Sequence, residues 1–153
     1  MNNAQYAGFW IRFGATLIDS LLFVIILTPL MFGIYGEDYF LSEDLVLGTA
    51  DVLLTYILPV VVIIWFWLRF RATPGKMATK LTIVDARTGG SISLGQAILR
   101  YAGYVISSLP LGLGYIWVGF DKRKQGWHDK LANTVVIRNT ADEPVVFDDA
   151  GQN

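Results

Sequence analysis

Two long stretches without charged side chains constrain this chain more than any other feature. Residues 20–36 and 52–68 contain no Asp, Glu, Lys or Arg, and extending the first stretch back to Phe13 adds only Asp19. At about 1.5 Å per helical residue, about 17 to 22 residues cross the roughly 30 Å hydrocarbon core of a bilayer with some tilt. We therefore predict transmembrane helices over about residues 13–35 and 52–68.

The composition argues against the alternative, a soluble protein with two buried helices. Hydrophobic residues make up 54% of the 153 residues and charged residues 16%, whereas about a quarter of the residues are charged in ordinary soluble domains. A single domain of this length is too small to wrap two helices that are apolar all round. A cleaved signal peptide fits poorly, because only Arg12 supplies a basic charge before the first stretch and no small-residue cleavage site follows it.

The charges between the apolar stretches indicate an orientation. The connection between the predicted spans is purely acidic, with Glu37, Asp38, Glu43, Asp44 and Asp51. Residues 69–91 instead carry the basic residues Arg69, Arg71, Lys76, Lys80 and Arg87 against one acid, Asp85. Because Lys and Arg accumulate on the cytoplasmic side of a membrane, we expect both termini to be cytoplasmic and the acidic connection to lie outside.

A third apolar region, residues 101–120, is interrupted by Pro110, Gly112 and Gly114 and is followed at once by basic residues. A single crossing would place those basic residues outside, against the positive-inside rule. Split at Pro110, helices over residues 94–109 and 111–120 would measure about 24 Å and about 15 Å, and neither crosses the core. We predict a re-entrant or interfacial helical hairpin over about residues 94–120, with a third or fourth span as the alternative.

The remaining segments predict a small cytoplasmic β element. Residues 80–85 alternate in the manner of a strand, residues 87–90 have turn chemistry, residues 91–93 can return as a strand, and residues 134–137 favour strand as well. Residues 139–153 are acidic and are expected to form a mobile tail. The predicted fold is thus an all-α membrane protein with a small β element, formed by one domain over residues 6–138.

Asp19 is the most informative residue, because a carboxylate inside a span costs about 2.5 to 3.5 kcal/mol at the helix centre. It needs a partner, water or a proton, and it is either a cation or proton site or a structural carboxyl that locks helix packing. Arg12 lies on the same helical stripe, but about 10.5 Å away along the axis, too far for a reliable direct pair. Arg12 is therefore expected to meet a lipid phosphate or a carboxylate from elsewhere in the chain.

Other chemistries find little support in the sequence. The basic cluster Lys122, Arg123 and Lys124 is expected to anchor the chain to anionic lipid. His128 and Asp129 supply at best half of a metal site, and the chain has no cysteine and no other histidine. Basic residues beside spans do not form a nucleic-acid-binding face. We expect no metal, no cofactor and no enzymatic activity, since the carboxylates lack a nucleophile or a metal set.

Three ordered segments of the chain form a recognisable set of motifs: residues 6–19; residues 73–76, 82–85 and 89–90; and residues 127–136. Together they resemble the RDD family of bacterial membrane proteins. In this resemblance Arg12 is the arginine and Asp19 the first aspartate of the first-helix motif. Asp129 is the second aspartate, in the carboxyl-terminal motif, with Asp121 as the alternative. Asn133 stands where the motif leads us to expect glycine, which leaves the turn after Asp129 open.

The resemblance implies a multi-pass protein of the bacterial inner membrane, in a family suspected of transporting ions or small ligands. The leading hypothesis is a homo-oligomeric transporter that contacts membrane lipids and uses Asp19 as its charge-switching group, with Arg12 as counter-ion and Asp129 contributing from the hairpin side. We also expect Arg12 and Asp129 to approach each other on the cytoplasmic side. The alternative is a non-transporting membrane scaffold or assembly module, in which the same residues hold the helices together.

Overall fold

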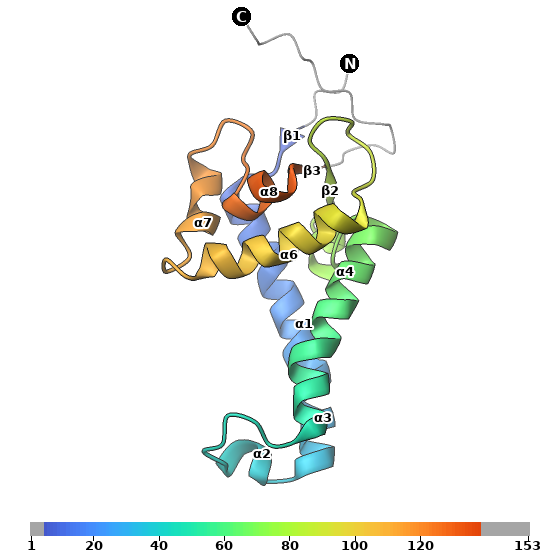
Figure 1. Ribbon diagram of the computed structural model, residues 1–153, viewed down its shortest axis with the longest axis vertical. Coiled ribbons are helices and arrows are strands. Elements are labelled where there is room, and N and C mark those ends of the chain that lie inside the picture. Colours follow the sequence, from blue (N-terminus) through green and yellow to red (C-terminus); the bar gives the residue numbers. More distant parts are fainter. Residues whose placement is uncertain (1–4, 139–153) are drawn as a thin grey trace, which may run out of the picture.

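The computed structural model describes residues 5–138 and shows two long helical rods that carry a smaller head at one end (Figure 1). The first rod is α1 (Phe9–Tyr35). The second is a continuous run of α3 (Thr49–Asp51), the π-helix η1 (Val52–Ile57) and α4 (Leu58–Phe70), and α2 (Asp38–Leu41) lies in the connection between the rods. The predicted fold class, a mostly helical protein, is confirmed, and the predicted tail, residues 139–153, lies outside the described residues.

Both rods have the properties of membrane spans. The stretches Phe9–Tyr35 and Thr49–Ala78 are long and apolar enough to cross a membrane, and 11% of the most apolar window of each is buried inside the protein. Large apolar side chains such as Leu21, Ile25 and Val61 therefore point away from the protein. Exposing that much apolar surface to water would be costly, whereas acyl chains solvate it well. The two predicted spans are confirmed, each as part of a longer helical stretch.

The third apolar region forms a broken helical pair rather than one straight helix. α6 (Leu94–Ser108) is followed by a turn, then by α7 (Leu113–Ile116) and the 3-10 helix η2 (Trp117–Gly119), and the two parts are bent by 113°. Gly112 has a φ of 78° at the start of α7, a left-handed conformation that glycine adopts without strain. The break predicted around Pro110 is therefore observed.

The head contains a three-stranded antiparallel sheet. Its strands are β1 (Gln5–Tyr6), β2 (Leu81–Asp85) and β3 (Thr134–Arg138), in the order β1-β3-β2, with Ile83 opposite Val136. The predicted β2 and β3 are confirmed, and β1 was not predicted. The returning strand expected over residues 91–93 is wrong, because Ser93 instead caps α6: its side chain accepts from Gln96 N, and the Gln96 side chain accepts from Ser93 N.

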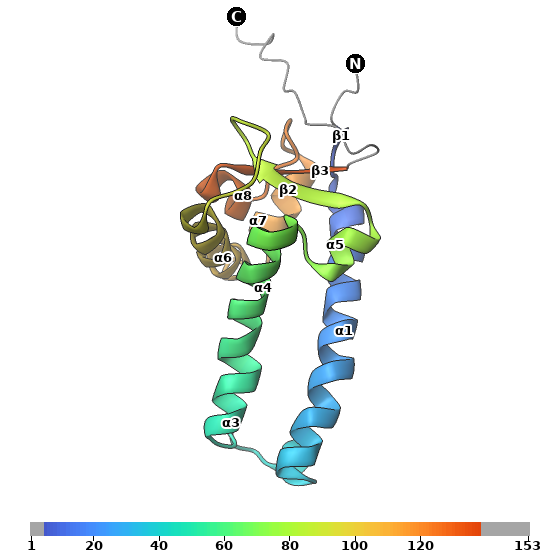
Figure 2. The same cartoon turned by 90° about the vertical axis from the view of Figure 1, so that its right-hand side faces the viewer.

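Two close helix contacts hold the structure together, one between the head and the first rod and one within the head (Figure 2). α5 (Pro74–Ala78) packs on α1, and α8 (Trp127–Ala132) packs on α6. A Cβ added to Gly75 would lie 2.0 Å from the Ala15 carbonyl oxygen, and one added to Gly103 would lie 2.6 Å from His128 Cα. Both contacts therefore require a residue without a side chain.

We expect Gly75→Ala to weaken the attachment of α5 to α1, because its methyl group would overlap the α1 backbone, which is not free to move. Overpacking of this kind costs about 1 to 3 kcal/mol. The thermal unfolding midpoint in detergent should fall clearly. The control is Gly33→Ala in α1, where nothing lies within 4 Å of the added Cβ and the midpoint should stay the same or rise. Equal midpoints for the two variants would contradict the close contact.

Candidate functional site

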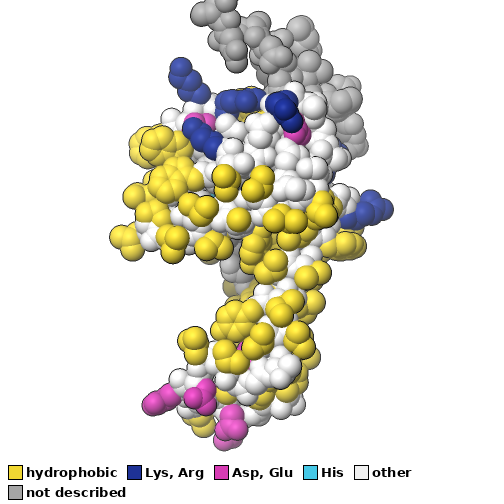
Figure 3. Space-filling model, in the orientation of Figure 1, with side chains coloured by type: hydrophobic (Ala, Val, Ile, Leu, Met, Phe, Trp, Pro, Cys, Tyr) yellow, Lys and Arg dark blue, Asp and Glu magenta, His cyan; other side chains and the backbone are white. Residues whose placement is uncertain are grey.

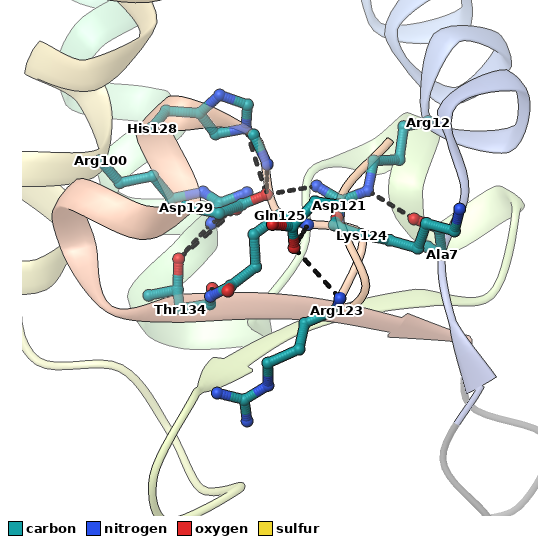
Figure 4. A network of polar contacts seen from close by, with 11 residues as sticks. Ala7, Arg12, Arg100, Asp121, Arg123, Lys124, Gln125, His128, Asp129 and Thr134 are labelled. Atoms are coloured by element: carbon teal, nitrogen blue, oxygen red, sulfur yellow. Dashed lines mark hydrogen bonds and ion pairs between the residues drawn. The ribbon is translucent and has the colours of Figure 1, made fainter. Parts of the chain in front are cut away.

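Asp129 is the centre of a buried ion-pair network in the head (Figure 4). It lies in the first turn of α8, and its carboxylate accepts from the backbone N–H of Gly126 at 3.0 Å, which closes the amino end of this short helix. Its side chain is fully buried. Arg12 Nη1 lies 2.5 Å from Asp129 Oδ2, and the guanidinium of Arg100 contacts Asp129 Oδ1. Two cations from distant segments therefore share one carboxylate.

Arg12 connects the start of α1 to the carboxyl-terminal part of the head. Besides its contact with Asp129, its Nε donates to the Ala7 carbonyl at 2.9 Å and its Nη2 donates to the Lys124 carbonyl at 2.5 Å. The approach of Arg12 and Asp129 that we expected from the sequence is therefore observed. These contacts use every arm of the guanidinium fork, so Arg12 is positioned with little freedom.

Arg100 is the member of the network that sequence reasoning missed. It extends from α6, is completely buried, and donates to Thr134 Oγ1 at 2.5 Å as well as pairing with Asp129. Its guanidinium also lies 5.5 Å from the centre of the Trp67 ring and 5.8 Å from that of Tyr104. The available signal was its position: it is the only charged residue between Arg87 and Asp121, so an apolar hairpin that carried it had to bury and pair it.

The electrostatics of the network keep Asp129 ionised. Burial by itself would raise the pKa of Asp129, but the guanidinium groups of Arg100 and Arg12 outweigh that effect and hold its pKa well below the usual range. Because two arginines and a backbone N–H already occupy this carboxylate, it has little capacity to take up a further cation. We call this ion-pair network of Arg12, Arg100 and Asp129 the clasp.

His128 lies beside the clasp and is neutral at physiological pH. Burial lowers the pKa of His128 to about 3, against the opposing attraction of Asp129. Its ring stacks on Tyr104 with 4.3 Å between ring centroids, and its Nε2 lies 3.5 Å from Asp129 Oδ2. Its Nδ1 is buried without a hydrogen-bond partner among the described residues. The imidazole therefore acts here mainly as a flat packing surface.

Asp121, the alternative second aspartate, organises the loop before α8. Its Oδ1 lies 2.5 Å from Lys130 Nζ, and its Oδ2 accepts from the backbone N–H groups of Arg123 and Gln125, each at 3.1 Å. Lys130 and those N–H groups lower its pKa although burial acts to raise it. None of these contacts involves Arg12, so the geometry pairs Arg12 with Asp129 and gives Asp121 a separate, local role.

The three residues of the predicted basic anchor, Lys122, Arg123 and Lys124, differ in their exposure and in their contacts with the head. Lys122 is exposed, Lys124 Nζ donates to the Gly119 carbonyl at 3.0 Å, and Arg123 Nη2 donates to the Ala86 carbonyl at 2.9 Å. The Arg123 guanidinium also lies 6.0 Å from the centre of the Tyr6 ring. Arg123 therefore binds within the head, and the lipid contact of the cluster stays a prediction.

Asp19 lies apart from the clasp and is held by uncharged donors. Its Oδ2 accepts from the Thr73 hydroxyl at 2.5 Å and its Oδ1 from the backbone N–H of Gly75 at 2.7 Å, so it joins α1 to the start of α5. No ion pair within residues 5–138 includes Asp19, and Arg12 is committed to Asp129. Within the same residues no cluster of His, Cys, Asp and Glu could hold a metal ion.

Comparison with known proteins identifies the family of this chain. The model of the RDD family matches residues 6–133, which include Arg12, Asp19 and Asp129. The chain belongs to the RDD family. No solved structure matches it.

Two curated relatives match over most of their own length, and a third matches over less than half of its length. The uncharacterized protein YxaI of Bacillus subtilis is 29% identical over 147 residues, covering 86% of this chain and 96% of that protein. The uncharacterized membrane protein YteJ of the same bacterium is 30% identical over 148 residues, covering 86% and 80%. A protein of Rickettsia prowazekii, RP437, is 38% identical over 76 residues, half of this chain. The name of YteJ describes that relative as a membrane protein.

The backbone conformation of Asn133 explains why asparagine can stand where the RDD motif led us to expect glycine. Asn133 ends α8 with φ 52° and ψ 50°, the left-handed conformation that a glycine would adopt most readily. Asparagine is the other residue that commonly accepts this conformation, because its short side chain tolerates it. The turn between Asp129 and β3 therefore has the left-handed geometry that a glycine at this position would also adopt.

We expect Arg12→Gln and Asp129→Asn to be strongly coupled in a double-mutant cycle. Asp129→Asn leaves two buried guanidinium groups without their carboxylate, and breaking a buried pair costs about 3 to 5 kcal/mol. Once Asp129 is neutral, Arg12→Gln should cost much less than in the native chain. The measurement is the free energy of unfolding in detergent for the four proteins. As a control, Arg12→Gln combined with Asp85→Asn should be additive, since Asp85 bonds to Arg87, Thr88 and Gln96 instead.

The neutral state of His128 predicts an acid-sensitive stability. In the unfolded chain histidine takes up a proton near pH 6.5, whereas the folded value is about 3, so stability is full above pH 6.5 and falls as the pH drops toward 3. The slope is at most about 1.4 kcal/mol per pH unit. His128→Phe preserves the stacking and removes this titration, so its unfolding midpoint should fall less between pH 7 and pH 4. Parallel pH profiles for the two proteins would contradict the buried neutral histidine.

Proposed function

We propose that this RDD membrane protein is a homo-oligomeric carrier of an ion or small ligand, in which the carboxylate of Asp19 exchanges one positively charged partner for another. The observation that carries the proposal is the contrast between its two acidic family residues. Asp129 is neutralised by two arginines. Asp19 has hydrogen bonds from Thr73 and Gly75 and no ion pair within residues 5–138.

The surroundings of Asp19 are compatible with exchange. It is half-buried, and it lies ten residues into α1, about 15 Å along the helix from its first residue. Each of its oxygens accepts one hydrogen bond from a neutral group, and a carboxylate has further lone pairs for a cation or a proton. A negative charge in a spanning helix that lacks a fixed counter-ion gains most from such a partner.

The surfaces of the rods support an oligomer. A polar path across a bilayer needs protein on all sides. Within residues 5–138, two helical stretches are each long and apolar enough to cross a membrane, and Figure 2 shows them extending from the head. Most of their side chains face outward, as the 11% burial of each apolar window shows. Further copies of the chain would supply the missing walls, and the exposed rod surfaces offer the area for that contact.

We expect Asp19→Asn to abolish ion flux. The test reconstitutes the protein into liposomes and follows luminal pH while Na⁺, K⁺ or Li⁺ gradients are imposed. Native protein should move protons against one of these cations, and Asp19→Asn should reduce that rate at least tenfold, because an amide neither ionises nor exchanges a proton. Asp38→Asn, an exposed acid in the connection between the rods, is the matched control and should retain the rate.

Two results would count against the carrier. Flux in Asp19→Asn equal to native flux would remove Asp19 from the mechanism. Absence of flux from folded native protein under every gradient would favour the second candidate, a membrane scaffold or assembly module. One observation favours the scaffold: Asp19 receives the hydroxyl of Thr73 and the N–H of Gly75 at the point where α5 is pressed against α1, an arrangement that also serves as a structural staple. Asp19→Asn would then lower the unfolding midpoint as strongly as Gly75→Ala.

A further inference from the structure

We infer that α6, α7 and η2, together with Phe120 directly after them (residues 94–120), form an interfacial arm. The arm lies along the bilayer surface on the side of the head, with its outer face among the acyl chains of that leaflet. The inference does not depend on ion exchange at Asp19. It decides among the crossing, re-entrant and interfacial arrangements that the sequence left open.

The two faces of α6 have an unusual division of residues. The buried stripe is made of Ala97, Arg100, Gly103 and Ser107, which recur at helical spacing. The large side chains of the exposed face are aliphatic and are 47% to 77% exposed: Leu94, Ile98, Leu99, Val105, Ile106 and, directly after the helix, Leu109. The only charged side chain of α6 is therefore turned inward, and the outward face is aliphatic. A helix facing water shows the opposite pattern.

The outward face points toward the membrane region. α6 makes its most extensive contacts with α8, which lies on the side of the head away from the rods (Figure 1). α6 itself runs across the long axis of the molecule, whereas α1 and α4 run along that axis in both views (Figures 1 and 2). The face opposite α8 is thus directed toward the side from which the rods extend.

The apolar surface of the arm is continuous with that of the spans. Figure 3 shows hydrophobic side chains covering α6 and α7 and continuing down the second rod, with Lys and Arg on the head above them and Asp and Glu at the far end. Leu111, Trp117 and Phe120 at the turn and end of the arm are 96%, 45% and 81% exposed. The acyl chains that surround the rods can therefore also cover the apolar surface of the arm. The basic residues of the head then lie at the level of the lipid headgroups.

The dimensions of the arm exclude a normal crossing. The 15 residues of α6 measure about 22 Å, less than the roughly 30 Å core. The following segment is bent by 113° from α6, so the pair does not add up to one straight span. An amphipathic helix of this length, lying parallel to the surface, buries its apolar face without leaving a backbone break at the bilayer centre.

Spin labelling measures the depth of the arm directly. The chain has no cysteine, so single variants Ile98→Cys, Ile106→Cys, Leu109→Cys and Phe120→Cys can be labelled one at a time in full-length protein in lipid nanodiscs. Ser91→Cys on the exposed head surface and Ile25→Cys in α1 serve as references for water and for the bilayer interior. Collision rates with oxygen and with a water-soluble nickel chelate give the depth of each label.

The four arm labels should show one shallow depth, at least threefold more accessible to oxygen relative to the nickel chelate than Ser91→Cys and shallower than Ile25→Cys. Three results would overturn the inference. Labels as accessible to the nickel chelate as Ser91→Cys would place the arm in water. Labels shielded from both reagents would mean that protein, such as a second copy, covers it. A steady change in depth from Ile98 to Phe120 that passes the level of Ile25 would mean that the segment crosses the membrane.

Discussion

The shared carboxylate of Asp129 is the interaction on which the arrangement of the head depends. Arg12 begins the first rod, Arg100 belongs to α6, and Asp129 lies in α8, so one buried charge joins segments that are far apart in the sequence. Each arginine alone would be a buried cation with a large desolvation cost, and the attraction of the shared carboxylate offsets that cost only when all three elements are in place. The clasp therefore stabilises one arrangement of these three elements over others. The apolar core, which includes Trp67 and Val136, stabilises the same arrangement.

The parts of this structure that local chemistry determines could be predicted, and the parts that depend on distant partners mostly could not. Length and apolar composition identify both rods, Pro110 and the following glycines identify the broken arm, and alternation identifies β2 and β3. Residues 91–93 have the same β-prone composition, but the Ser93 and Gln96 side chains cap α6 there. Arg100 escaped notice because it precedes the charge-free run and its partners come from α8 and β3, a relation that spacing along the chain does not encode.

Asp19 shows a different limit of sequence reasoning. The rule that an intramembrane carboxylate needs a partner holds, since Asp19 bonds to Thr73 and Gly75. The rule did not say whether the partner would be charged, and that difference separates a permanent staple from a site with capacity for a cation. Gly75 serves two purposes in this arrangement: its lack of a side chain lets α5 approach the α1 backbone, and that approach brings its N–H to the carboxylate.

Two polar contacts attach α1 to the head, one through Arg12 and one through Asp19, and they differ in strength. Arg12 and Asp19 lie on the same stripe, about 10.5 Å apart along the axis. Arg12 holds α8 through a buried ion pair, whereas the half-buried Asp19 holds α5 through neutral donors. An ion pair in a low-dielectric interior is much harder to open than hydrogen bonds that water can replace. The contact between α5 and Asp19 is therefore the easier of the two to open. The proposed carrier would use such a division between a fixed frame and a contact that opens, and α1 holds both attachments within about two helical turns.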